Sequence, residues 1–167
     1  GFTPLEGLVM GTRCGDVDPG ALEFLAKKEN LDFAQVLDIL NQESGVLGIS
    51  KNFSSDFREL KDAEIKYNDQ AALAREIFAY RVAKYVGSYA AAMNGVDNIV
   101  FTAGVGENDS DIRMEICSYL EYLGITIDEV KNRDEAEAFR ISDGMSRVNV
   151  LVIKTNEELE IAREAAE

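Results

Sequence analysis

One stretch decides the fold: Asn98-Ile-Val-Phe-Thr-Ala-Gly-Val-Gly-Glu-Asn108. Its apolar residues 99–101 are β-branched or aromatic and uninterrupted, which predicts a strand buried on both faces of a parallel sheet. Gly104 and Gly106 follow, and a glycine loop lets main-chain N–H groups approach a base, a ribose or a phosphate closely. The stretch therefore predicts either a nucleotide-binding loop or the ordinary strand-to-helix turn of an α/β protein.

The residues after this stretch predict the rest of the architecture. Asp109 is an N-cap residue type, and apolar residues at helical spacing follow it from Ile112 to Leu123, so a helix should come next. A second apolar run at 148–153 predicts another strand with a helix behind it. Two successive strand–loop–helix units indicate a parallel or mixed sheet flanked by helices. We expect residues 1–167 to form a single α/β domain.

Composition narrows the class of protein. The chain has 167 residues, 31 acidic and 17 basic, with a formal net charge of −14. This charge argues against nucleic acid or an anionic membrane as a partner, so a bound polyanion must be held by local groups. No apolar run approaches the length of a membrane span. The two distant cysteines favour a reduced, cytoplasmic protein, and the lack of histidine in these residues excludes imidazole catalysis.

Capping residues predict where several helices begin. Asp18 followed by Pro19 marks one start, because aspartate is a favoured N-cap and proline is tolerated in the first turn. Asp32 marks the next helix. Thr155 and Glu158 stand three residues apart and predict a capping box at the last helix.

Apolar spacing predicts three further segments. Residues 69–94 form the longest expected helix, apolar on nearly all sides, and we expect it to be buried together with its tyrosines. Residues 124–128 alternate apolar and polar side chains, as a short edge strand does. Residues 131–140 are strongly charged and are expected to be solvated surface.

Two isolated charged residues are candidate site residues with structural alternatives. Arg13 stands among glycines and can present its guanidinium to a phosphoryl oxygen. Its local alternative, which the residues alone favour, is an ion pair with Asp16 or Asp18. Glu157 follows the second strand, where open α/β sheets bind ligands, and can hold a magnesium ion. The structural alternative is that the Glu157 carboxylate stabilises the positive N-terminal end of a helix.

The segment Ser54-Ser-Asp-Phe-Arg58 has two interpretations as well. Asp56 could accept hydrogen bonds from ribose hydroxyls, with the Arg58 guanidinium lying against an adenine face. Alternatively, Asp56 caps a helix and Glu59 is its N3 carboxylate, which the spacing alone favours.

The sequence lacks the common nucleotide-binding motifs, but a set of its segments resembles one family. The glycine stretch is not the dinucleotide fingerprint, since Asp109 stands where a third glycine belongs, and there is no Walker lysine and no Gly-x-Ser-x-Gly elbow. Five segments in order resemble the C-terminal part of the acetate kinase family, in the acetokinase branch of the sugar kinase, Hsp70 and actin superfamily. They are Gly1-Phe-Thr-Pro-Leu-Glu-Gly7, Met10-Gly-Thr-Arg-Cys-Gly-Asp-Val-Asp-Pro19, Ser54-Ser-Asp-Phe-Arg58, Phe101-Thr-Ala-Gly-Val-Gly-Glu-Asn108 and Thr155-Asn-Glu-Glu158.

The resemblance, which covers essentially the whole chain, implies a ribonuclease H-like fold and a role for each motif. Arg13 corresponds to the arginine that stabilises the transferring phosphoryl group, and Glu157 to a magnesium-linked glutamate. The nucleotide-contacting residues that it implies are Asp56, Phe57, Arg58, Gly104, Val105, Gly106, Glu107 and Asn108. Ala103 replaces a glycine that is common at the start of the second nucleotide segment.

The activity that the resemblance implies is reversible transfer of the ATP γ-phosphoryl group to acetate, which gives acetyl phosphate and ADP. It also implies Mg²⁺ or Mn²⁺, a homodimer and a cytoplasmic location. The family's chain is more than twice as long, and several of its functional residues precede the counterpart of Gly1, so we expect these 167 residues alone to be inactive. Two alternatives stay open: a propionate or butyrate kinase, and a non-catalytic nucleotide-binding or assembly module.

Overall fold

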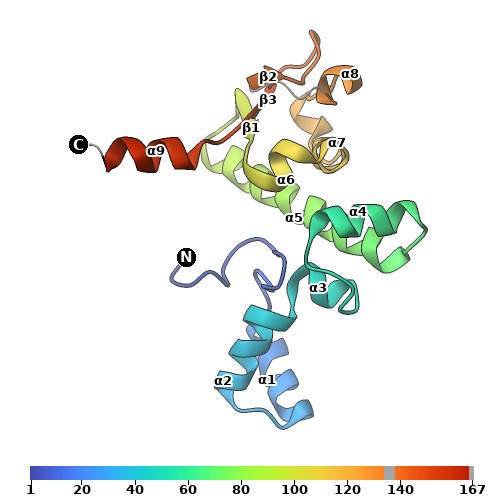
Figure 1. Ribbon diagram of the computed structural model, residues 1–167, viewed down its shortest axis with the longest axis vertical. Coiled ribbons are helices and arrows are strands. Elements are labelled where there is room, and N and C mark those ends of the chain that lie inside the picture. Colours follow the sequence, from blue (N-terminus) through green and yellow to red (C-terminus); the bar gives the residue numbers. More distant parts are fainter. Residues whose placement is uncertain (134–137, 166–167) are drawn as a thin grey trace. The chain divides into compact units, whose positions relative to one another are not determined.

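The chain forms two compact units along its length. The computed structural model describes residues 1–133 and 138–165, and contacts divide it into Gly1–Val82 and Ala83–Glu167. The long helix α5 (Asp69–Ala92) contains the division (Figure 1). Each unit has its own buried apolar residues. The expectation that residues 1–167 form a single α/β domain stays a prediction.

The first unit is helical in its described residues. Its elements before α5 are α1 (Pro19–Glu29), α2 (Phe33–Asp38), the π-helix η1 (Ile39–Glu43), α3 (Gly45–Ile49) and α4 (Phe57–Ile65). Val36, Leu40, Val46 and Leu60 are buried and come from four different elements. Burial of these side chains is the main apolar contribution that holds the short helices together.

The predicted helix starts of this unit are confirmed. The Asp18 carboxylate accepts a hydrogen bond from the Gly20 amide at 2.8 Å, with Pro19 in the first turn. Asp32 closes a capping box with Gln35, in which each side chain accepts from the other residue's backbone N–H. These bonds satisfy N–H groups that have no partner within a helix.

The second unit carries a mixed sheet. Its elements after α5 are β1 (Asn98–Phe101), α6 (Ala103–Asn108), α7 (Ser110–Ser118), the 3₁₀ turn η2 (Glu121–Leu123), α8 (Glu129–Asn132), β2 (Ala138–Arg140), β3 (Asn149–Ile153) and α9 (Glu157–Glu164). The strand order is β1-β3-β2, with β1 parallel and β2 antiparallel to β3. The predicted α/β architecture with a mixed sheet and helices is confirmed, as is the parallel pairing of the two predicted strands.

Strand β1 is buried on one face only, so the expectation of two buried faces was wrong. Ile99 and Phe101 are buried, whereas Val100 is 47% exposed. Successive side chains of a strand point to opposite faces, and β1 is one of the two edge strands of the described sheet. The apolar run reflects β propensity rather than full burial.

Helix α5 has nearly the predicted bounds, but its burial differs from the prediction. Tyr80 and Tyr89 are 46% and 60% exposed, whereas Ala71, Ala74 and Ala79 are completely buried. Small alanines allow close packing on the covered side, and the bulky tyrosines lie on the open side. The helix is therefore not buried all round.

Two other segments differ from the sequence-based expectation. Instead of an edge strand at 124–128, Ile127 forms only an isolated bridge with Ser142. The charged stretch 131–140 contains the end of α8 and strand β2, whose pairing with β3 no local pattern predicted. Residues 134–137 of that stretch lie outside the described residues.

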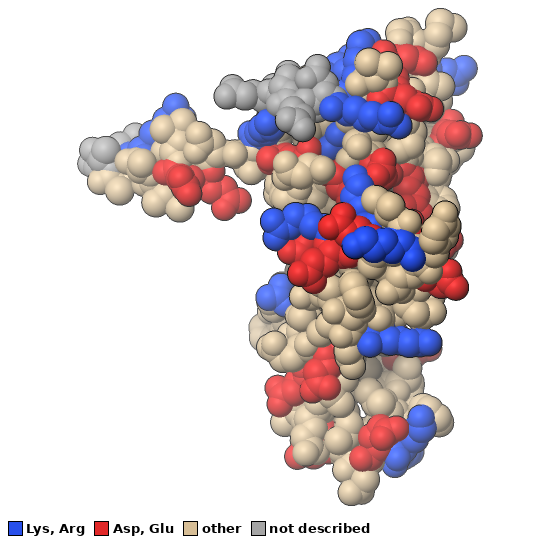
Figure 2. Space-filling model, turned by 45° about the vertical axis from the view of Figure 1, so that its right-hand side comes forward, with Lys and Arg blue, Asp and Glu red and all other residues tan. Residues whose placement is uncertain are grey.

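Charged side chains of both signs are scattered over the face drawn in Figure 2, between larger areas of uncharged residues. The chain has a net charge of −14, and on this face its acidic residues are not gathered in one patch. Among the described residues, no helix combines the length and the apolar character that a membrane crossing requires.

Candidate functional site

Arg13 lies in a tight turn that the π-helix and α3 hold in place. The Met10 amide donates to the Arg13 carbonyl at 3.0 Å, which closes the turn. The Cys14 amide donates to the Leu40 carbonyl at 3.0 Å, and the Thr12 hydroxyl donates to the Asn41 carbonyl at 2.8 Å. A π-helix presents carbonyl groups differently from an α-helix and occurs often at functional sites. Here two of its carbonyls anchor the turn.

The Arg13 side chain is exposed. Within the described part of the chain, its guanidinium makes no hydrogen bond or ion pair. The ion pair considered from the sequence is absent because Asp16 pairs with Arg81 at 3.0 Å and Asp18 caps α1. An exposed arginine on an anchored turn can offer its planar donor fork to an anionic ligand.

The Asp56 segment lies next to this turn. A Cβ built on Gly11 would lie 3.3 Å from the Ser55 carbonyl oxygen, so the two segments are neighbours. Asp56 caps α4 by accepting from the Arg58 amide at 2.8 Å. Its carboxylate also accepts from the Arg58 guanidinium, with 2.6 Å between Nη2 and Oδ2. That side-chain hydrogen bond is the main reason why the pKa of Asp56 falls to about 2.

These contacts leave part of the segment available to a ligand. The Arg58 side chain is 90% exposed, so its guanidinium plane remains accessible beside Asp56. Phe57 is half-buried and packs edge-to-face on Phe78, with 4.6 Å between ring centroids. Glu59 does not complete a capping box, because its carboxylate accepts from the Ser54 hydroxyl at 2.6 Å.

The glycine stretch forms a short helix in place of the expected loop. Residues Ala103–Asn108 are helix α6, and neither Gly104 nor Gly106 has a positive φ. In this stretch the residue with left-handed backbone is Ala103, at φ 58°, the position at which the resemblance described above implies a glycine. A Cβ built on Gly104 would meet nothing within 4 Å, so the protein leaves open space beside this backbone.

Glu107 joins the ends of the two parallel strands. Its Oε1 accepts from the Ala103 amide at 2.6 Å, from the Thr155 amide at 2.8 Å and from the Thr155 hydroxyl at 2.9 Å. The hydrogen bond from the Thr155 amide is the main reason why the pKa of Glu107 is lowered. Thr155 is therefore not the N-cap of α9, and the predicted capping box with Glu158 is wrong. Asn156 caps this helix instead.

Glu157 and the glycine stretch share one hollow. A hollow of about 470 Å³ is lined by Ala103, Gly104, Thr155, Asn156, Glu157 and Glu158. Among the described residues, the exposed Glu157 carboxylate has no hydrogen bond or ion pair. The structure thus brings a free carboxylate beside the open backbone of Gly104.

The side chains at this hollow could hold a magnesium ion only if a bound ligand supplied further coordinating atoms. The described residues contain no group of three or more His, Cys, Asp or Glu side chains that could hold a metal by themselves. Mg²⁺ usually takes one or two carboxylates and completes its shell with water and substrate phosphates. The free carboxylate of Glu157 meets that requirement.

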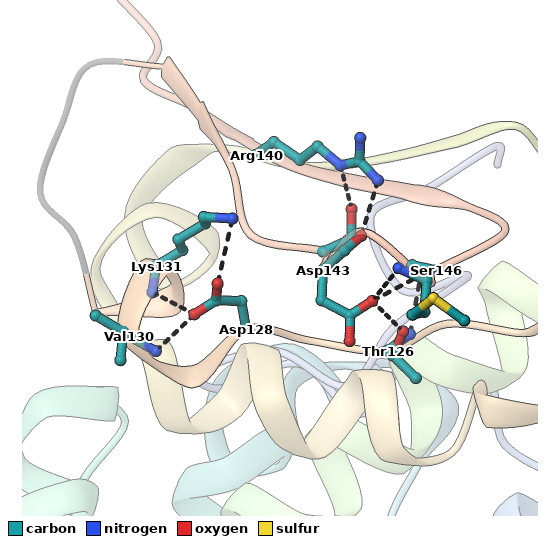
Figure 3. A network of polar contacts seen from close by, with 9 residues as sticks. Thr126, Asp128, Val130, Lys131, Arg140, Asp143 and Ser146 are labelled. Atoms are coloured by element: carbon teal, nitrogen blue, oxygen red, sulfur yellow. Dashed lines mark hydrogen bonds and ion pairs between the residues drawn. The ribbon is translucent and has the colours of Figure 1, made fainter.

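Two other carboxylates of this unit, those of Asp143 and Asp128, are occupied by structural hydrogen bonds. In Figure 3 the Asp143 carboxylate faces the Thr126 hydroxyl, at 2.7 Å, and the Ser146 amide, at 2.9 Å. Asp128 caps α8 by accepting from the Val130 and Lys131 amides. The hydrogen bonds from Thr126 and Lys131 are the main causes of the lowered pKa values of Asp143 and Asp128, respectively.

Arg113 is a supporting residue that sequence reasoning missed. It is 2% exposed, and its Nη1 donates to the carbonyls of Gly106 and Glu107 at 2.9 and 2.8 Å. Its Nε donates to the Asn132 side chain at 2.9 Å, and burial lowers the pKa of its guanidinium. Arg113 thereby satisfies carbonyls in the last turn of α6. Its sequence context is that of a surface arginine, and only its burial in the folded chain reveals its structural role.

The comparisons with known proteins agree on one family. Residues 1–163 match the model of the acetokinase family. The acetate kinase of Carboxydothermus hydrogenoformans is 58% identical over 167 residues, which are all of this chain and 42% of that protein. The chain therefore spans about two fifths of the length of this curated relative.

Solved structures agree with the sequence comparison. The acetate kinase of Porphyromonas gingivalis has a TM-score of 0.92 and 48% identity, covering 98% of this chain and 41% of that one. A propionate kinase of Francisella tularensis has a TM-score of 0.89 and 43% identity, with the same two coverages. The fold expected from the resemblance is confirmed by these similarities.

Proposed function

The chain belongs to the acetokinase family, and we propose that it supplies the nucleotide-binding side of an ATP-dependent acetate kinase. The reaction would be reversible transfer of the ATP γ-phosphoryl group to acetate, giving acetyl phosphate and ADP. The observation that carries the proposal is the hollow shared by the Gly104 backbone and the free Glu157 carboxylate. It offers a nucleotide segment and a metal-binding carboxylate on the same surface.

The residues have separate roles in this proposal. Gly104, Val105, Gly106, Asn108 and the backbone of Glu107 form one nucleotide-binding region, and Asp56, Phe57 and Arg58 form the other. The Glu107 side chain is hydrogen-bonded within the protein. Arg13 stabilises the charge on the transferring phosphoryl group, since it is exposed, without a partner and held on an anchored turn. Phosphoryl transfer depends on such positioning and on electrostatic stabilisation.

The proposed metal is Mg²⁺ or Mn²⁺, held by Glu157 together with nucleotide phosphates. When bound, such an ion neutralises phosphate charge during transfer. We further propose a homodimer, a cytoplasmic location and no useful kinase activity of the 167-residue chain by itself. Acetyl phosphate formation by this chain, compared with that by the full-length protein, tests the last point. Equal turnover numbers would refute it.

Substitution of two arginines in the full-length protein tests the assigned roles. Arg13→Ala should lower kcat by about 10³-fold while ATP affinity changes little, because its charge acts on the transferring group. Arg13→Lys should be intermediate, since lysine keeps the charge and loses the planar fork. Arg58→Ala should mainly weaken ATP binding. An Arg13→Ala protein with unchanged kcat would refute the role proposed for Arg13.

A second candidate substrate comes from the propionate kinase that this chain resembles at a TM-score of 0.89. Acetate and propionate differ by one methylene, so the choice between them depends on the shape of an acyl pocket. Steady-state kinetics of the full-length protein with acetate, propionate and butyrate test the preference. A higher kcat/KM for propionate or butyrate than for acetate would make the protein a kinase of the longer acid.

A further inference from the structure

We infer that Glu107 acts as a positioning residue, which holds the segment carrying Glu157 against helix α6. The inference rests on the proposed kinase function and deepens it. Its basis is the set of three hydrogen bonds to one carboxylate oxygen, from the Ala103 amide, the Thr155 amide and the Thr155 hydroxyl. The donors belong to two segments that lie about fifty residues apart in the sequence.

The sheet explains why one side chain can reach both segments. Strands β1 and β3 are parallel neighbours, with Phe101 opposite Val152, so their carboxyl ends emerge side by side. Ala103 follows the first strand and Thr155 follows the second. A carboxylate between these ends can accept hydrogen bonds from both segments, which beyond the strands are no longer paired as strands of the sheet. Its charge strengthens each hydrogen bond relative to a neutral acceptor.

This connection fixes the place of Glu157. Thr155 stands two residues before Glu157, and Asn156 between them caps α9. The Glu157 side chain has no partner among the described residues, so only its backbone determines where its carboxylate lies. If the Glu107 bonds are lost, the Glu157 carboxylate can move away from the Gly104 side of the hollow. Metal-linked nucleotide binding should weaken, whereas binding without metal should not.

Nucleotide binding by the Glu107 carboxylate itself is the competing explanation. Oε1 already accepts three hydrogen bonds, which is more than the two lone pairs of one oxygen hold ideally. A nucleotide hydroxyl that bound this oxygen would have to replace the Thr155 or Ala103 donors. Direct contact predicts a loss of nucleotide affinity whether or not metal is present.

The test compares four variants of the full-length protein: Glu107→Ala, Glu107→Gln, Thr155→Val and the matched control Thr155→Ser, which keeps the hydroxyl. Hydrogen exchange of the Thr155 amide reports on the connection itself. Calorimetric titration with ADP, once in EDTA and once in Mg²⁺, separates metal-linked binding from metal-free binding. Circular dichroism checks that each variant is folded.

In Glu107→Ala we expect hydrogen exchange at the Thr155 amide to be at least about tenfold faster. We also expect the factor by which Mg²⁺ increases ADP affinity to fall by about 10–100-fold, as happens for other residues that orient a metal ligand. ADP affinity in EDTA should stay within about twofold. Thr155→Val should show a smaller loss in the same direction, and Thr155→Ser should resemble the wild type. Glu107→Gln should lie between wild type and Glu107→Ala, because its amide oxygen still accepts but carries no charge.

Two results would overturn the inference. A loss of ADP affinity in EDTA in both Glu107 variants would show that the carboxylate contacts the nucleotide directly. Unchanged Thr155 exchange and unchanged Mg²⁺-linked affinity would show that Glu107 does not position Glu157. If Glu107→Ala is unfolded, Glu107→Gln and Thr155→Val decide the matter. A wild-type protein that binds no ADP would refute the proposed function, and the exchange data would still report separately on the hydrogen bonds.

Discussion

Gly45→Ala is expected to release the turn that carries Arg13. Gly45 has φ 64°, and a Cβ built there would lie 2.3 Å from the Met10 carbonyl oxygen and 2.9 Å from the Arg13 nitrogen. Left-handed backbone costs about 1–2 kcal/mol for a residue with a Cβ. Overpacking against atoms that cannot rotate away adds about 1–3 kcal/mol. The local cost is therefore about 2–5 kcal/mol.

Hydrogen exchange of the full-length protein measures this cost at defined amides. The Val46 and Leu47 amides donate to the carbonyls of Met10 and Gly11, at 2.9 and 3.0 Å, and so report whether the turn is in place. A cost of 2–5 kcal/mol corresponds to exchange that is about 30-fold to several thousand-fold faster. The rate of phosphoryl transfer should fall as well, because the turn carries Arg13.

Gly124→Ala is the matched control. Gly124 has φ 78°, but the atoms nearest to its added Cβ belong to the flexible Arg147 side chain. We expect a cost of about 1–2 kcal/mol confined to its own unit, with exchange at Val46 and Leu47 unchanged. If Gly45→Ala leaves exchange at these two amides at the wild-type rate, the turn does not depend on the missing Cβ and the reasoning is refuted.

The remaining predictions concern buried and titrating groups. Arg113→Met should destabilise the protein by about 2–5 kcal/mol, because the partly buried carbonyls of Gly106 and Glu107 lose their donor. Substitution of the exposed Arg133 by Met is the control, and equal melting temperatures of the two variants would contradict the prediction. The stability that Asp56 contributes should be fully present above its ordinary pKa of 3.8 and should be lost as pH falls toward about 2. A carboxyl titration of Asp56 by NMR with a midpoint at or above 3.8 would rule that out. Cys117 is buried with a pKa of about 12, so iodoacetamide at pH 8 should label Cys14 first; equal labelling rates in mass spectra would oppose this.

Local sequence patterns predicted those parts of the fold that depend on residues a few positions apart. Asp18 and Asp32 cap their helices because a side-chain oxygen reaches a backbone amide two or three residues ahead. Strands β1 and β3 were predicted from the apolar runs at 99–101 and 148–153, and the structure pairs them in parallel. The same patterns said little about burial, as the exposed Tyr89 of α5 shows.

The ordered motifs supported the family assignment, but they did not give the contacts of individual residues. Glu107 was assigned to the nucleotide from its motif alone, and the structure shows its carboxylate bonded to Thr155. Thr155 and Glu158 had the spacing of a capping box, yet the cap is Asn156, because the Thr155 hydroxyl donates to Glu107 instead. Competition from a distant acceptor cannot be read from local spacing.

The sequence by itself determined the α/β class, the helix starts at Asp18 and Asp32, the two parallel strands and the motifs by which the chain resembles the acetokinase family. Only the tertiary structure decided which side chains are occupied: Glu107 and Arg113 are hydrogen-bonded, whereas Arg13 has no partner among the residues that the structure describes. The physical reason is distance along the chain. A cap or an alternating strand depends on near neighbours, whereas the partners of Glu107 and Gly45 are brought close only when strands and turns far apart in sequence have packed together.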